Sequence, residues 1–77
     1  MEKIDCILIL KHGNPFIYKV KYKGIYYTIN TQGFKYTTKV GGFMYYIFGV
    51  ASRSIFFKIK INLNTLNCYL INTQIME

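Results

Sequence analysis

Apolar and polar residues alternate along the segment 16–30, and a period of two is typical of β-strands. Its first half has the apolar set Phe16, Tyr18, Val20 and Tyr22, which alternates with Ile17 and three lysines. Lys23-Gly24 fits a two-residue turn, because glycine adopts positive φ at little cost. This turn pairs Tyr22 with Ile25 and predicts a hairpin with one apolar face and one face of lysines and aromatics.

The same two-faced pattern recurs twice further along the chain. Residues 34–40 alternate before Gly41-Gly42, a strong hairpin signal, and residues 55–63 alternate before Asn64-Thr65. Residues 6–10 are apolar without alternation, as in a strand that is buried on both faces. No long apolar run has helical spacing. Together these patterns predict an all-β protein.

We predict a single small β domain that spans residues 1–77. The expected architecture is an antiparallel meander of about six or seven short strands, curled into a small barrel (SH3-like or OB-like) or a compact sandwich. Closure into a barrel would also protect the edge strands from aggregation. The side chains expected to point inward are Tyr18, Val20, Tyr22, Ile25, Tyr27, Ile29, Tyr36, Val40, Phe43, Ile47, Phe57, Ile59, Ile61, Cys68 and Leu70.

The charge balance points to a polyanionic partner. Ten Lys and Arg residues stand against three acids, which gives a formal net charge of +7. Such a charge favours nucleic acid, an acidic protein or an anionic surface. An AT-rich genome offers another explanation, because the codons of the abundant Ile, Lys, Asn, Tyr and Phe are AT-rich. It does not explain why no acid occurs between Asp5 and Glu77.

In the predicted register, lysines and aromatic residues gather on the face opposite the core. The candidate binding residues are Lys19, Lys21, Tyr26, Lys35, Lys39, Tyr46, Phe48, Arg53, Lys58, Lys60 and Tyr69, with Arg53 in a loop. Lysines neutralise phosphates, and exposed aromatic rings stack on bases at about 1–3 kcal/mol each. This set predicts a small basic protein that binds nucleic acid without sequence specificity.

Two hairpin segments, 20–24 and 39–41, locally resemble the small SH3-like chromatin proteins of thermophilic archaea. Those proteins also run a Lys-Tyr-Lys-Gly hairpin into a second hairpin that lies over DNA. In this chain the first hairpin continues with Ile-Tyr-Tyr, where that family would have charged residues, and no helical C-terminus is expected. The resemblance concerns the arrangement of the two hairpins and does not imply that this chain belongs to that family.

Apolar residues on the same face support a different function. Ile17, Met44, Phe48, Val50 and Phe56 would form an apolar patch there, and such patches more often mark protein interfaces. The alternative is therefore a phage or mobile-element protein that inhibits a host factor, for example a defence nuclease, through protein contacts. A homodimer that covers Ile17, Met44, Phe48 and Phe56 is a further possibility. Binding of a charged nucleotide is a third alternative.

Catalysis and metal binding have little support in the sequence. The only histidine is His12, and the acids Glu2, Asp5 and Glu77 lie near the termini. General acid–base catalysis needs such groups in position, so no enzyme, catalytic residue or cofactor is expected. The two cysteines and His12 lack the paired spacing of a zinc site, so no metal site is expected either.

The cysteines and the apolar runs indicate an intracellular protein. Two cysteines without a framework of close spacings fit a reducing compartment, which predicts a cytoplasmic location. Cys68 falls at a core position, and a disulfide with Cys6 is possible if the first and last strands are neighbours. Residues 6–10 are too short for a signal peptide, and the uncharged run 40–52 is too short to span a membrane.

Overall fold

The computed structural model describes residues 2–76, and its secondary structure consists of seven antiparallel β-strands without a helix in that range. The strands are β1 (Glu2–Lys11), β2 (Asn14–Tyr22), β3 (Ile25–Thr28), β4 (Thr31–Val40), β5 (Phe43–Ala51), β6 (Ile55–Asn62) and β7 (Cys68–Ile75). They form one sheet in the order β3-β2-β1-β7-β6-β5-β4, with β3 and β4 at its edges. The all-β prediction is confirmed.

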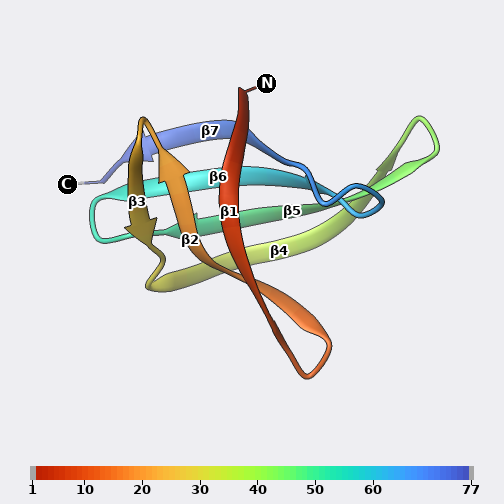
Figure 1. The fold of residues 1–77 in the computed structure, drawn as a ribbon, viewed down its shortest axis with the longest axis horizontal. Helices are drawn as coiled ribbons and strands as arrows, with labels where there is room; N and C mark the ends of the chain where they lie inside the picture. Colours follow the sequence, from red (N-terminus) through yellow and green to blue (C-terminus); the bar gives the residue numbers. More distant parts are fainter. Residues whose placement is uncertain (1, 77) are drawn as a thin grey trace.

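The sheet is curled into a half-barrel, so that its two halves lie across one another. In Figure 1, β1, β2 and β3 cross in front of β5, β6 and β7. The halves are joined where Ile4 pairs with Cys68 and Glu2 pairs with Leu70, and beyond Ile4 strand β1 pairs only with β2. The core between them comprises Ile4, Ile17, Val20, Ile29, Phe48, Val50, Phe57, Ile59, Ile61 and Cys68.

Two of the three predicted turns form as expected. Lys23 and Gly24 both have positive φ, at 51° and 80°, and Gly41 and Gly42 have φ of 56° and 85°. Two successive residues with positive φ match the twist of the flanking strands. The third turn is longer than predicted, because Asn62 Oδ1 accepts the backbone N–H groups of Asn64 and Thr65 and opens a loop before β7.

A β-bulge in β2 reverses part of the predicted core. The pairing of β1 with β2 shifts between Ile7 and Leu8, which leaves Tyr18 as an extra residue. Ile17 and Val20 therefore both point into the core, where they are 1% and 0% exposed. The prediction that Tyr18 points inward is wrong, because the bulge turns its side chain to solvent.

In the β4–β5 hairpin, the predicted register is confirmed but the predicted face is wrong. Tyr36 pairs with Ile47 and Lys35 pairs with Phe48, as expected. It is Phe48, however, that belongs to the core, whereas Tyr36 is exposed. Both faces of this hairpin are rich in apolar residues, so alternation alone cannot identify the buried one.

The remaining core predictions divide clearly. Those confirmed as pointing inward are Val20, Ile29, Phe57, Ile59, Ile61 and Cys68. Ile47 is buried, but it lies on the same side of the sheet as Tyr36, away from the core cluster, so its predicted direction is wrong. Tyr22, Tyr27 and Leu70 are half-buried and pack against the core. Those that are exposed, contrary to the prediction, are Tyr18, Ile25, Tyr36, Val40 and Phe43. Ile25, Val40 and Phe43 lie at the ends of their strands, next to the hairpin turns.

Candidate functional site

The side of β4–β7 that faces away from the core combines lysines with aromatic rings, and we call it the outer face. Its residues are Phe34, Tyr36, Thr38, Tyr45, Ile47, Phe56, Lys58, Lys60, Asn62 and Tyr69, together with Lys3 at the start of β1. Residues that pair directly across neighbouring strands share a face, so the pairing register defines this surface.

One continuous row of side chains crosses the outer face. Tyr36 of β4 pairs with Ile47 of β5, which pairs with Lys60 of β6. Lys60 pairs with Tyr69 of β7, and Tyr69 pairs with Lys3 of β1. The row therefore places tyrosines on both sides of the Ile47–Lys60 pair and a second lysine at its far end.

The neighbouring row contains an aromatic cluster beside Lys58. Phe34 pairs with Gly49, which pairs with Lys58. The Phe34 ring lies over Gly49, where any Cβ would collide with it. Phe34 also stacks on Tyr36, with ring centroids 6.0 Å apart and an interplanar angle of 22°. The exposed rings of Phe34 and Tyr36 thus form a flat apolar platform next to a lysine.

The third row places an aromatic ring beneath Lys60. Tyr45 pairs with Asn62, which lies two residues after Lys60 on the same side of β6. Lys60 Nζ lies 4.1 Å from the centroid of the Tyr45 ring, a cation–π contact that holds the ammonium at the surface. Tyr45, Lys60, Asn62 and Tyr69 line a hollow of about 260 Å³.

Strands β4 to β7 contain no carboxylate side chain of their own. The sequence has no acid from residue 6 to residue 76, a range that contains all four strands. Lys58 and Lys60 are two residues apart on β6, so their Cα atoms are separated by about 6.6 Å on the same side of the strand. An anionic chain lying along β6 would meet two ammonium groups in succession.

The predicted site residues do not share one face, so that part of the prediction is wrong. Lys58, Lys60 and Tyr69 lie together on the outer face. The other residues are distributed over three further places. The outward side of β1–β3 carries Lys19, Lys21 and Tyr26; the inward side of β4–β5 carries Lys35, Tyr46 and Phe48; and Lys39 and Arg53 lie at or beside turns.

Burial decides which of these residues remain candidates. Phe48 is 1% exposed in the core, so it cannot offer a binding surface. Lys35 Nζ donates to the carbonyl oxygen of Pro15 at 3.3 Å and approaches the Phe16 ring to 4.9 Å, which draws it towards β2. Lys21 Nζ lies 5.7 Å from the Tyr26 ring on the other half of the barrel, with Asp5 paired beside it.

Sequence reasoning missed four of the charged and aromatic residues that matter most on the outer face: Lys3, Phe34, Tyr36 and Tyr45. Tyr36 was assigned to the core, because the face of the β4–β5 hairpin was inverted. Lys3 gave no local signal, since only its pairing with Tyr69 brings it to this surface. The proposed homodimer contact also needs correction, because Ile17 and Phe48 are buried within the protomer and cannot reach a partner.

Comparisons with protein-family models, curated proteins and solved structures find no match. Inference about function therefore rests on the residues of this chain. Within residues 2–76, no helix is long and apolar enough to cross a membrane. The described part of the chain also has no group of three or more His, Cys, Asp or Glu residues that could hold a metal ion.

Cys6 and Cys68 are free thiols on the neighbouring strands β1 and β7. Interaction with the Cys68 sulfur, together with burial, raises the pKa of the Cys6 thiol, and Cys68 Sγ itself donates to Leu66 O at 3.7 Å. A raised pKa keeps Cys6 protonated where an ordinary thiol begins to ionise, and the thiol is a poor nucleophile. Cys68 is 7% exposed, so its sulfur is sheltered from reagents.

We therefore expect Cys6 to resist alkylation by iodoacetamide at about pH 8, near the ordinary thiol pKa of ~8.5. Mass spectrometry of timed samples would follow the modification, with urea-unfolded protein as the control in which both cysteines react quickly. Labelling of Cys6 in the folded protein at the rate of the unfolded chain would contradict the contact with Cys68.

Proposed function

We propose that this protein binds single-stranded nucleic acid, without strong sequence preference, on the outer face of β4–β7. The observation that carries the proposal is the row Tyr36–Ile47–Lys60–Tyr69–Lys3 beside Lys58 and the Phe34–Tyr36 platform. It combines the two features that single-strand binding needs: positive charge along the backbone path and aromatic surfaces for bases.

Each kind of residue has a distinct role in this proposal. Lys58 and Lys60 would neutralise successive phosphates and release counterions, and Lys3 would extend the path across β7. Phe34 and Tyr36 are 43% and 49% exposed, so part of each side chain remains open for a base to stack on. Neither contact reads base identity, because every nucleotide has a phosphate and a base with a π-face. A free-thiol protein with this role would act inside the cell.

The test is a fluorescence-anisotropy titration of labelled single- and double-stranded oligonucleotides at two salt concentrations. We expect tighter binding of the single strand, because stacking requires unpaired bases. Three phosphate contacts predict a slope of log affinity against log salt of roughly −2, at about −0.7 per contact. Absence of binding at low salt, or equal affinity for both forms, would contradict the proposal.

The alternative function, inhibition of a host protein by a phage or mobile-element product, is favoured by a different observation. Large apolar side chains are exposed near the ends of two hairpins: Leu10 is 73% exposed, and Val40 and Phe43 are 53% and 49% exposed. Such residues suit a protein contact that buries apolar surface. Binding through them would persist at high salt, whereas non-specific nucleic-acid binding falls steeply.

A further inference from the structure

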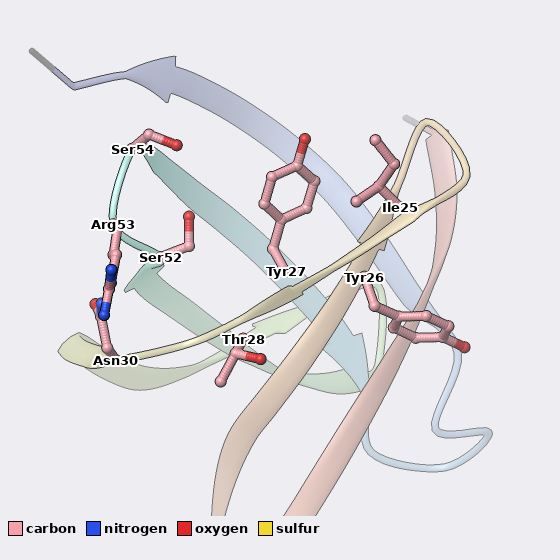
Figure 2. Close-up of a pocket in the computed structure, with 8 residues that line it drawn as sticks. All are labelled: Ile25, Tyr26, Tyr27, Thr28, Asn30, Ser52, Arg53 and Ser54. Atoms are coloured by element: carbon pink, nitrogen blue, oxygen red, sulfur yellow. The ribbon is translucent and has the colours of Figure 1, made fainter.

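A second candidate site lies away from the outer face, in the crevice between β3 and the β5–β6 turn (Figure 2). Its volume is about 480 Å³, within the range of small-molecule sites. The lining residues are Ile25, Tyr26, Tyr27, Thr28, Asn30, Ser52, Arg53 and Ser54. No lysine of the outer face belongs to this set, so the crevice offers different chemistry.

Arg53 gives the crevice an anion-binding group. It is the one arginine of the chain, it is exposed, and no acid among residues 2–76 lines the crevice. Figure 2 shows its side chain extending along the turn towards Asn30, with Ser52 and Ser54 on either side of it in the chain. A guanidinium binds phosphate oxygens through two parallel N–H donors, and the exposed hydroxyl of Ser54 can add a further hydrogen bond, whereas the Ser52 hydroxyl already donates to Ile55 O.

The turn that carries Arg53 is held in place from several directions. The backbone N–H of Ser52 donates to the carbonyl of Ile55 at 3.0 Å, and the Ser52 Oγ accepts the Ile55 N–H at 3.3 Å. On the two sides of the turn, Met76 N–H donates to Ser54 O at 2.8 Å and Asn30 N–H donates to Ala51 O at 2.9 Å. A fixed turn lowers the entropic cost of binding.

Tyr27 gives the crevice a fixed aromatic wall. Its ring centroid lies 5.7 Å from that of Phe57, which is 0% exposed, and 6.5 Å from that of Tyr22. The ring is half-buried against the core and its remaining surface lines the crevice, where Figure 2 shows it standing across from Ser54. A ring held in this way can stack on a base without losing rotamer freedom.

We propose that this crevice binds one phosphorylated nucleotide, with its phosphate on Arg53 and its base against Tyr27. The inference goes beyond binding on the outer face and does not depend on it, because it uses none of the same lysines. The nucleotide can be free in solution or can be the 5′-phosphorylated end of a strand, since both present the same group.

Titration of the ¹⁵N-labelled protein with adenosine 5′-monophosphate, followed by two-dimensional NMR, tests the site. We expect shifts centred on the amides of Tyr27 and Ser52–Ser54, and binding about tenfold tighter than that of adenosine. Arg53→Gln is expected to remove this tenfold difference, and it should fold normally because Arg53 is exposed. Lys11→Gln, with the same change of charge at an exposed residue outside both the outer face and the crevice, is the matched control and should keep the difference.

Several outcomes would overturn the inference. Equal affinity for the monophosphate and adenosine, an unchanged difference in Arg53→Gln, or shifts confined to the outer face would each do so. Oligonucleotides with and without a 5′-phosphate then distinguish the two sources. If the 5′-phosphate raises the affinity and this rise depends on Arg53, the site binds strand ends. If the 5′-phosphate leaves the affinity unchanged, the site binds free nucleotides. If the protein binds oligonucleotides but not the monophosphate, only the crevice proposal is refuted. If it binds the monophosphate but not oligonucleotides, only the proposal for the outer face is refuted.

Discussion

Ile59→Ala is expected to destabilise the protein by about 2–5 kcal/mol, the usual range for removing a large aliphatic side chain from a core. Ile59 is 0% exposed and lies in the middle of β6, where it pairs with Phe48 on one side and Leu70 on the other. Truncation leaves a cavity between strands that cannot close without moving the sheet. Since a core in a domain of this size rarely supplies more than about 3–5 kcal/mol of stability, the loss approaches or exceeds the whole, and the variant should be substantially unfolded at 37 °C.

Urea denaturation followed by far-ultraviolet circular dichroism would measure this effect. The matched control is Val40→Ala, a truncation at a residue 53% exposed beside the β4–β5 turn. Alternation predicts that both residues point inward, whereas the structure buries only Ile59. The control is expected to change the stability by less than about 0.5 kcal/mol. A loss of similar size in both variants would contradict the structure and favour the alternation.

Local chemistry explains why the hairpins could be predicted from the sequence. A two-residue turn with glycine fixes which residues pair, and this information lies within a few positions of Gly24 and Gly41-Gly42. The pairing that brings Tyr22 opposite Ile25 and Val40 opposite Phe43 was therefore correct. The bulge at Tyr18 is different, because it depends on how β1 pairs with β2 and leaves no mark on the alternation of β2 itself.

The candidate site was predicted best where the alternation is sharpest. In β6 the lysines Lys58 and Lys60 alternate with Phe57 and Ile59, so only one face could be buried. In β4–β5 both faces carry aromatic residues, and contacts with strands distant in the sequence determine which face is buried. Phe48 packs in the core with residues of β2 and β6, a contact that no local pattern reveals. For this reason the sequence predicts a site on the face of Phe48, whereas the structure exposes the face of Tyr36.

The largest expected effect on function comes from the double variant Lys58→Gln, Lys60→Gln. Glutamine removes the charge but keeps part of the stem, so the packing over Ile47 and Tyr45 is largely retained. If both ammonium groups contact phosphates, the salt slope for single-stranded binding should become shallower by about 1.4, at about 0.7 per lost contact. Anisotropy titrations at several salt concentrations measure the slope directly.

The double variant Lys19→Gln, Lys21→Gln is the matched control. It lowers the net charge by the same amount but acts on the outward side of β1–β3, the other half of the barrel. A general attraction between a basic protein and a polyanion would respond equally to both variants, because it depends on total charge. A contact site on β6 would respond to the first variant far more than to the second. Equal losses would therefore show that charge alone drives binding, and a larger loss from Lys19 and Lys21 would move the site to β1–β3.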